Sequence, residues 1–251
     1  MRIWAIGDLH LSFGVPDKAM DYFGPTWQEH ARKIEQNWKN VISPDDLVLI
    51  PGDISWALTL EEAIPDLEWI HALAGTKVLL KGNHDFWWGS LNKLVKVLPP
   101  SIHVVQNSAF HWKNATIGGA RLWDTPEYSF GQFVAYRENP RKNIDVQIQD
   151  NLAEKIFERE LQRLELSLQK LSPDAQLRIA MTHYPPLGAD LNPSRASKIL
   201  EKYKIQICVF GHLHNIREDI SLFGVAKEGI RYELTSCDYL RFHPVCLCQD
   251  L

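Results

Sequence analysis

The sequence predicts a layered α/β fold, and two patterns along the chain support this prediction. Short runs of Ile, Val and Leu recur without strict alternation, which is typical of strands buried on both faces. Helical patterns lie between these runs, as expected for a layered α/β core. The 251 residues are enough to bury a substantial core. Length alone fits one or two domains, but because no repeat or Pro/Ser-rich linker interrupts the chain, we expect a single domain over residues 1–251.

The expected elements can be placed by residue number. The apolar runs that predict strands are residues 2–6, 46–50, 77–80, 102–105, 177–181 and 205–210. Helical spacing occurs at residues 25–42, 60–74 and 143–171. Pro65 lies inside the second of these and is expected either to divide it or to start a new turn.

Two further segments follow other patterns. The stretch "DISLFGVAKEGIRYELTSCDYL" contains two or three short strand patterns joined by Gly-containing turns. We therefore expect the C-terminal strands to be an antiparallel addition. Residues 122–143 fit neither the helix nor the strand period, and we expect them to form a long surface loop or a partial cap.

Composition and charge exclude several classes of protein. The formal net charge is −4, which does not favour binding of extended nucleic acid through phosphate neutralisation. No apolar run approaches the roughly 20 residues of a membrane span. The first residues show no secretory signal pattern, and the four cysteines lack Cys-x-x-Cys spacing. We expect a cytoplasmic protein with reduced thiols. The sequence does not predict an oligomeric state.

Polar side chains follow five of the predicted strands at the point where each strand ends. In open α/β sheets, ligands bind in the crevice beyond the carboxyl ends of the strands. Chain order is irrelevant, because the sheet gathers these ends in space. The seven candidate ligands found there are Asp8, His10, Asp53, Asn83, His183, His212 and His214.

The spacing of these residues has a physical reading. Asp8 and His10 are two residues apart, as are His212 and His214, and in extended backbone such residues point to the same side. Each pair is therefore expected to offer two side chains to one region. Glycines at positions 7, 52, 82 and 211 precede the polar residues and allow sharp turns and close approach of the backbone.

The donor set indicates a metal site. Seven oxygen and nitrogen donors are too many for one first-row ion that must also hold water, whereas two ions sharing a bridging carboxylate would use them well. The set contains no thiolate, so it suits Mn²⁺, Fe or Zn²⁺, with Mg²⁺ also open, and argues against a structural cysteine-type zinc site. Two ions about 3.5–4 Å apart can bind a bridging hydroxide and stabilise phosphoryl transfer.

The motifs resemble those of a known family. In chain order they are Asp8-x-His10, Gly52-Asp53, Gly82-Asn83-His84-Asp85, His183 and Gly211-His212-x-His214. Each is weak alone, but together they resemble the full motif set of the calcineurin-like metallophosphoesterases, and they extend from residue 7 to residue 214. The resemblance implies a layered sandwich of mixed β-sheets flanked by helices. It also implies a hydrolase acting on phosphoester bonds.

The resemblance further implies a role for each ligand. The first metal would be bound by Asp8, His10 and His214. The second would be bound by Asn83, His183 and His212. Asp53 would bridge the two divalent ions, of which Mn²⁺ is our first choice.

Two residues beside the ligands would act on the substrate. The resemblance implies that His84 is not a ligand but stabilises the phosphoryl oxygens or protonates the leaving group. Asp85 would orient His84, as carboxylates often orient histidines; the alternative is that Asp85 is an ordinary turn residue. We expect a metal-bridging hydroxide to attack phosphorus directly, without a covalent phospho-enzyme. The competing hypothesis is a non-catalytic interaction scaffold of the same fold, which the complete ligand set with His84 disfavours.

The substrate class is less defined by the sequence. The stretches "GDISWALTL" and "GNHDFWW" differ from the "GDxVDRG" and "GNHE" runs of protein Ser/Thr phosphatases, which argues against that activity. We expect a small phosphomonoester or phosphodiester, with nucleotide-like substrates included. As a hypothesis, Trp88 and Trp123 line the substrate pocket, and Arg121, Arg137 or Arg141 meets a second anionic group. The alternative is that these tryptophans are core residues beside the site.

Overall fold

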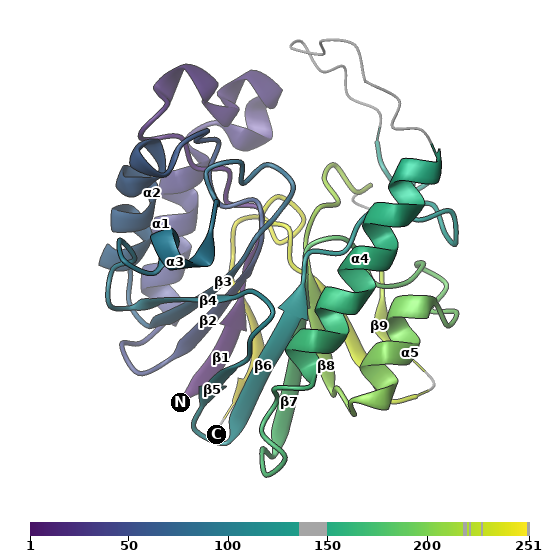
Figure 1. Ribbon diagram of the computed structural model, residues 1–251. Coiled ribbons are helices and arrows are strands. Elements are labelled where there is room, and N and C mark those ends of the chain that lie inside the picture. Colours follow the sequence, from purple (N-terminus) through teal and green to yellow (C-terminus); the bar gives the residue numbers. More distant parts are fainter. Residues whose placement is uncertain (136–149, 218–219, 221, 227, 250–251) are drawn as a thin grey trace.

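Two β-sheets pack face to face in the computed structural model, and helices cover the outer face of each sheet (Figure 1). The structure describes residues 1–135, 150–217, 220, 222–226 and 228–249. Buried residues from both sheets, among them Leu49, Val78, Ile117 and Ile179, form the apolar layer between the sheets. The predicted layered α/β fold with mixed sheets and flanking helices is thereby confirmed.

The first sheet is mostly parallel. Its order is β11-β1-β2-β3-β4, and β11 is antiparallel to β1 while the other pairs are parallel. The strands are β1 (Arg2–Ala5), β2 (Leu47–Pro51), β3 (Thr76–Leu80), β4 (Ile102–Val105) and β11 (Val245–Gln249). β2 is buried along its whole length, which explains its continuous run of apolar residues.

The second sheet is mixed and has the order β5-β6-β7-β8-β10-β9. Its strands are β5 (Phe110–Trp112), β6 (Ala115–Ala120), β7 (Leu177–Thr182), β8 (Ile207–Phe210), β9 (Gly224–Val225) and β10 (Arg231–Leu234). The C-terminal strands β9 and β11 are antiparallel to their neighbours, as expected. β10 is antiparallel to β9, as expected, but it lies parallel to its other neighbour, β8.

Helices α1 (His30–Val41), α2 (Leu60–Ala72) and α3 (Leu91–Leu94) lie on the first sheet. Residues 25–42 do not form one helix, because Glu29 adopts a left-handed conformation (φ 52°) between a short 3₁₀ turn, Pro25–Trp27, and α1. Two further 3₁₀ turns, Pro16–Lys18 and Met20–Phe23, precede it.

Helix α2 begins with a capping box. The Thr59 hydroxyl accepts a hydrogen bond from the backbone N–H of Glu62, and the Glu62 carboxylate accepts one from the backbone N–H of Thr59. Pro65 lies inside α2 and does not divide it. Buried Ala63, Leu67 and Ile70 hold the helix against the first sheet, and this packing offsets the hydrogen bond that proline cannot donate.

Helices α4 (Asp150–Leu168) and α5 (Arg195–Lys202) cover the second sheet. The expected helix over residues 143–171 is confirmed for the range of α4, while residues 143–149 lie outside the described residues.

Residues 122–133 contain no helix or strand, as expected for a loop, and Val134 forms a single bridge to Ile216. Residues 136–143 lie outside the described residues. None of the described helices is long and apolar enough to cross a membrane.

Candidate metal centre

The carboxyl ends of β1, β2 and β3 meet those of β7 and β8 at one edge of the sandwich. The seven candidate ligands follow these five strands, and the structure brings all of them together. Backbone hydrogen bonds tie the loops to one another: the Asp8 N–H donates to Gly52 O, and the His10 N–H donates to Asp53 O. The site is therefore built by both sheets.

One group of donors consists of Asp8, His10 and His214, whose ligand atoms lie within 4.8 Å of one another. Nε2 of His10 is 3.2 Å from Nε2 of His214. Nε2 of His214 is 3.7 Å from Oδ1 of Asp8. Asp8 and His10 are buried, whereas His214 is partly exposed, so the group is accessible to solvent only from the His214 side.

A second group lies beside the first. Oδ1 of Asn83 is 2.6 Å from Nε2 of His183 and 3.0 Å from Nδ1 of His212. Asp53 stands between the groups, with one carboxylate oxygen 3.4 Å from Nε2 of His183 and the other 3.7 Å from Nε2 of His10. Asp8, Asp53 and His183 also form a cluster that could hold an ion.

Hydrogen bonds at the outer nitrogens orient two of the imidazoles. Nδ1 of His183 donates to the backbone oxygen of Pro51 (3.1 Å), and Nδ1 of His214 donates to Oδ1 of Asp238 (2.9 Å). Burial lowers the pKa of His183, so its ring is neutral and its Nε2 carries a lone pair that points into the site. The lone pair of His183 faces Asn83 Oδ1 with no proton to share. Such convergence of acceptors suits a divalent cation, so the residues present fit a metal.

Burial tunes the charges of these donors. It lowers the pKa of His10 and of His212 well below the usual value, which favours the neutral, ligating form of each ring. Burial raises the pKa of Asp8 to about 8, against the attraction of His214. Burial lowers the pKa of His214, but the charge and hydrogen bond of Asp238, together with the charges of Asp8 and Asp53, outweigh burial and raise this pKa to about 9. Burial thus disfavours the charged form of the Asp8 carboxylate, and a bound cation would offset that cost.

The backbone at the ligands is not extended, although the i, i+2 spacing of the ligand pairs suggested that it would be. Asp8 (φ 55°), His10 (φ 45°), Asp53 (φ 51°) and His212 (φ 71°) all adopt left-handed conformations. The side chains of Asp8 and His10 therefore converge through tight turns and not through strand alternation. Non-glycine residues in this region cost roughly 1–3 kcal/mol each and cluster at functional sites.

Two of the glycines permit close approach at the ligands. A β-carbon on Gly82 would overlap the Asp53 carboxylate, and one on Gly211 would overlap the Asp8 carboxylate. Each carboxylate lies against bare backbone, and the Asp8 carboxylate accepts the backbone N–H of His212 at 2.9 Å. The expectation of close backbone approach is confirmed at these two positions.

His84 lies beside the seven candidate ligands and not among them. Its backbone N–H donates to Oδ1 of Asp53 (2.9 Å), while its ring is partly exposed and makes no hydrogen bond to any described residue. The ring packs against Trp56 (4.5 Å between centroids) and is 5.7 Å from His10. Trp56 also stacks on His10 at 4.9 Å and so positions both imidazoles.

Asp85 contacts the backbone and not the His84 ring that it was expected to orient. It is fully buried, and one carboxylate oxygen accepts from the N–H groups of Ile54 (2.9 Å) and Ser55 (3.2 Å) and from the indole of Trp87 (3.0 Å). The other oxygen accepts from the Gly82 N–H (2.7 Å). Asp85 thereby ties the loop that carries Asn83 to the loop that follows Asp53.

The two tryptophans of the substrate hypothesis differ. Trp88 is 1% exposed, belongs to the core and donates to Gln106 Oε1 (2.8 Å), which favours the alternative that it is a core residue beside the site. Trp123 is partly exposed, and Arg121 stacks over its ring at 4.5 Å. Trp123 lines a cavity of about 240 Å³ that reaches His212. Arg137 and Arg141 lie outside the described residues.

The sequence motifs did not reveal three residues that contact the ligands. Asp238 binds His214, the Tyr184 ring lies 4.0 Å from that of His212, and the Trp27 ring lies 5.5 Å from that of His214. Tyr184 follows His183 directly, so adjacency could have indicated it. Asp238 and Trp27 lie far from any motif, and only the fold brings them to the site.

Comparisons with known proteins identify a family for this chain. The model of the family described as "Calcineurin-like phosphoesterase" matches residues 1–215. No curated protein matches the chain. Similar solved structures include a protein of unknown function from Aquifex aeolicus (15% identity, 98% of this chain and 95% of that chain covered, TM-score 0.47). Another is a phosphopantetheinyl hydrolase from Mycobacterium tuberculosis (17% identity, 96% and 90% covered, TM-score 0.49). On the family match, which covers most of its length, the chain belongs to the calcineurin-like phosphoesterases.

Proposed function

We propose that this protein hydrolyses small phosphoesters with the help of two divalent metal ions held by the seven candidate ligands. One observation supports this most strongly: oxygen and nitrogen acceptors from five strand ends converge in two adjacent groups. The first ion would be held by Asp8, His10 and His214. The second would be held by Asn83, His183 and His212, with Asp53 reaching both.

Residues outside the ligand set would contact the substrate or hold those that do. Bound divalent ions supply an activated water nucleophile and Lewis acidity toward the phosphoryl oxygens. His84 is left outside the ligand set, so its free ring can contact the phosphoryl oxygens or protonate the leaving group. Trp56 packs on that ring and limits its movement, while Asp85 fixes the loop on which it stands. Trp123 lies at the edge of the cavity that reaches His212, where its ring can stack on a flat substrate group.

The finer assignments rest on residue chemistry. We propose Mn²⁺ as the working metal, because the donors are imidazoles, carboxylates and one amide, with Fe, Zn²⁺ and Mg²⁺ as alternatives. We propose a nucleotide-like monoester or diester as substrate, because Trp123 and Tyr184 border the ligands. Four reduced cysteine thiols fit a reducing compartment and support a cytoplasmic location. We also propose one domain over residues 1–251, in which described residues 122–135 belong to a surface loop or partial cap.

A substrate screen tests the proposed function. The protein loaded with Mn²⁺ would be assayed on bis-p-nitrophenyl phosphate, phosphomonoesters, nucleotides and UDP-sugars. We expect hydrolysis of at least one class, abolished by chelation and by Asp53→Asn, with retention in the exposed control variant Lys39→Gln. If Mn²⁺, Fe, Zn²⁺ and Mg²⁺ all bind but none supports hydrolysis, the protein is an interaction scaffold and the proposal is wrong.

A further inference from the structure

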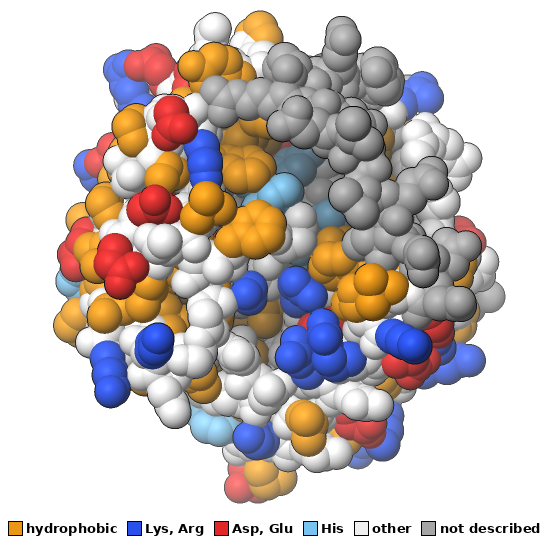
Figure 2. All heavy atoms as spheres, turned by 45° about the horizontal axis from the view of Figure 1, so that its top comes forward, with side chains coloured by type: hydrophobic (Ala, Val, Ile, Leu, Met, Phe, Trp, Pro, Cys, Tyr) orange, Lys and Arg blue, Asp and Glu red, His pale blue; other side chains and the backbone are white. Residues whose placement is uncertain are grey.

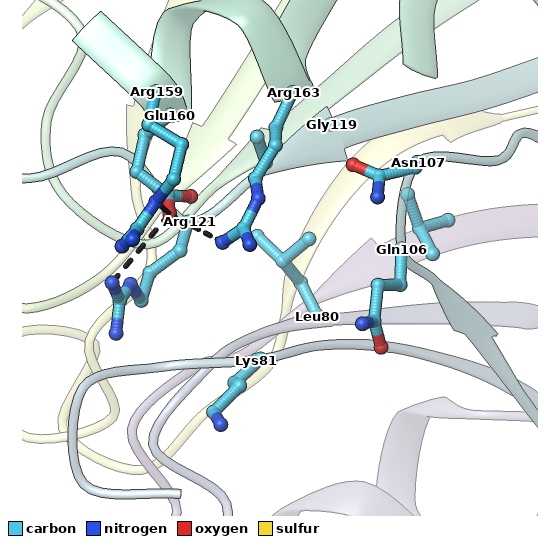
Figure 3. Close-up of a pocket in the computed structure, with 11 residues that line it drawn as sticks. Leu80, Lys81, Gln106, Asn107, Gly119, Arg121, Arg159, Glu160 and Arg163 are labelled. Atoms are coloured by element: carbon cyan, nitrogen blue, oxygen red, sulfur yellow. Dashed lines mark hydrogen bonds and ion pairs between the residues drawn. The ribbon is translucent and has the colours of Figure 1, made fainter. Parts of the chain in front are cut away.

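A basic pocket lies beside the candidate metal centre and is not used by the proposed function. Its cavity is about 250 Å³ and opens between α4 and the loops after β3, β4 and β6. Figure 3 shows Arg121, Arg159 and Arg163 grouped around Glu160, with Lys81 projecting from the β3 loop. Figure 2 shows Lys and Arg side chains gathered next to the hollow in which histidines are visible.

The charges of the basic pocket are not balanced by its own residues. Glu160 is 1% exposed and accepts a hydrogen bond from Nη1 of Arg163 (2.6 Å). Arg121 Nη2 and Arg159 Nε approach the same carboxylate oxygen only to 3.6 and 3.7 Å. Four cationic side chains, counting Lys81, thus line the pocket with a single carboxylate. Like charges this close repel one another, so an added anion would be stabilised.

The hydrogen-bonding groups of the basic pocket are mainly donors. Nε of Arg121 is buried and makes no hydrogen bond to any described residue. Oε1 of Gln106 accepts from the Trp88 indole, which leaves the Gln106 amide nitrogen to donate. An unsatisfied buried guanidinium N–H costs free energy unless a ligand accepts it. Guanidinium groups match phosphoryl oxygens in particular, because they can donate two parallel hydrogen bonds.

The chain places this pocket next to the candidate ligands. Lys81 is two residues before Asn83, and the backbone oxygen of Arg121 accepts the N–H groups of His183 (3.1 Å) and Tyr184 (2.9 Å). Arg121 also stacks on Trp123 at the rim of the site. The metal centre and the basic pocket are therefore formed by neighbouring residues of the same loops.

We infer that the basic pocket binds a second phosphoryl group of the substrate, set apart from the phosphoester at the metal centre. Arg159, Arg163 and Arg121 would hold it, and Glu160 would keep their guanidinium groups in place. This inference rests on the proposed function for the group at the metal centre. It narrows the substrate to a molecule that carries two separated phosphoryl groups.

Competition measurements test the inference. Inhibition of bis-p-nitrophenyl phosphate hydrolysis by the Mn²⁺-loaded protein would be measured with α,ω-alkane bisphosphonates from propane to hexane and with matched monophosphonates. The longer spacers avoid the metal chelation typical of geminal bisphosphonates. We expect one spacer length to bind roughly 10- to 100-fold tighter than its monophosphonate. Equal affinity at every length, or an equal gain from ω-carboxyalkyl phosphonates, would overturn the inference of a phosphoryl subsite.

Matched variants test whether the basic pocket causes the tighter binding of the bisphosphonate. Arg159→Gln and Arg163→Gln, singly and together, should remove most of the bisphosphonate advantage over the monophosphonate. Arg32→Gln removes an exposed arginine on α1 and should keep that advantage. Thermal unfolding of each variant verifies that it is folded. If the folded Arg159→Gln variant and the folded double variant both bind the bisphosphonate as much more tightly than the monophosphonate as the wild type does, the second phosphoryl group is not bound by the basic pocket.

A binding experiment separates this inference from the proposed function. Inorganic pyrophosphate would be titrated calorimetrically into metal-free protein in the presence of a chelator. We expect binding to the wild type and to Arg32→Gln, and at least about 10-fold weaker binding to the Arg159→Gln, Arg163→Gln double variant. If hydrolysis fails but this pattern holds, the basic pocket stands and the proposed function does not. If pyrophosphate binds the double variant as tightly as the wild type, the inference is wrong whatever the activity.

Discussion

Asp238 accepts a hydrogen bond from Nδ1 of His214 at 2.9 Å, and its second oxygen accepts the backbone N–H of Asn215 at 2.9 Å. This pair directs Nε2 of His214 toward Asp8 and His10. We expect Asp238→Asn to weaken binding of one divalent ion roughly 10- to 100-fold, because the carboxylate fixes the ring and raises its basicity. Metal titration of the variant by calorimetry checks this. Unchanged affinity for both ions would show that Asp238 has no part in metal binding.

His84 is expected to act on the substrate and not on the metal. His84→Asn should lower kcat by roughly 100- to 10,000-fold, the usual contribution of a proton donor or phosphoryl contact. Two equivalents of metal should remain bound, since the His84 ring is outside the seven candidate ligands. Metal content and turnover would be measured on the same sample. Loss of one metal equivalent would mean that His84 is a ligand.

Asp85 is expected to stabilise the fold of the site. Asp85→Ala leaves the N–H groups of Ile54, Ser55 and Gly82 without their acceptor. Because each unsatisfied buried donor costs about 1–3 kcal/mol, we expect the free energy of unfolding to fall by at least about 3 kcal/mol. Urea unfolding measures this, with His84→Asn as the neighbouring control. A stable Asp85→Ala variant with reduced turnover would instead support a role for Asp85 in orienting His84.

Trp88 and Trp123 should respond oppositely to truncation. Trp88→Ala removes a fully buried core side chain and should cost about 3–5 kcal/mol of stability with little change in KM. Trp123→Ala should raise KM for the physiological substrate with a smaller loss of stability, because its ring is partly exposed at the rim. Thermal unfolding and steady-state kinetics on both variants distinguish the two roles. A raised KM in folded Trp88→Ala would contradict the core assignment.

Asp66 gives a pH dependence of stability that does not involve the ligands. Burial raises the pKa of Asp66 to about 6, against hydrogen bonds from Ser55 and from the backbone of Phe13. The folded state therefore holds this proton more tightly than the unfolded chain. The resulting stability is fully present below about pH 4 and is lost as pH rises through about 6, by at most about 3 kcal/mol.

The comparison with Asp66→Asn isolates this effect. The stability difference between wild type and variant should move in favour of the variant as pH rises from about 4 to 6, and should stay constant above that. Urea unfolding at several pH values measures it. A difference that is independent of pH would show that Asp66 keeps its ordinary pKa in the fold.

Much of the architecture follows from local sequence. The strands of the sheet centres are runs of β-branched and aliphatic residues, and they were predicted within one or two residues. β6 was missed, because its sequence "ATIGGA" has little side-chain volume. Its environment explains this composition: a β-carbon on Gly119 would overlap the backbone of β7, and one on Gly118 would press on Leu168 and Leu171. Such packing cannot be inferred from one strand alone.

The candidate site was predictable to the extent that its residues form short motifs. Each candidate ligand follows a strand and lies in a recognisable pattern, so the motifs and the fold indicate the same edge of the sandwich. Asp238 and Trp27 contact His214 from distant segments of the chain, and no local pattern marks them. The position of Trp88 beside the "GNHD" motif suggested a place in the substrate pocket. Sequence position does not determine the direction of a side chain, and the Trp88 ring points into the core.

The metal dependence of hydrolysis tests the central claim most directly. Metal-free protein would be titrated with Mn²⁺ while bound metal and hydrolysis of bis-p-nitrophenyl phosphate are measured together. We expect activity to rise until two equivalents are bound and to vanish with a chelator. Maximal activity at one equivalent, or hydrolysis that persists without metal, would contradict a centre of two ions held by the seven candidate ligands.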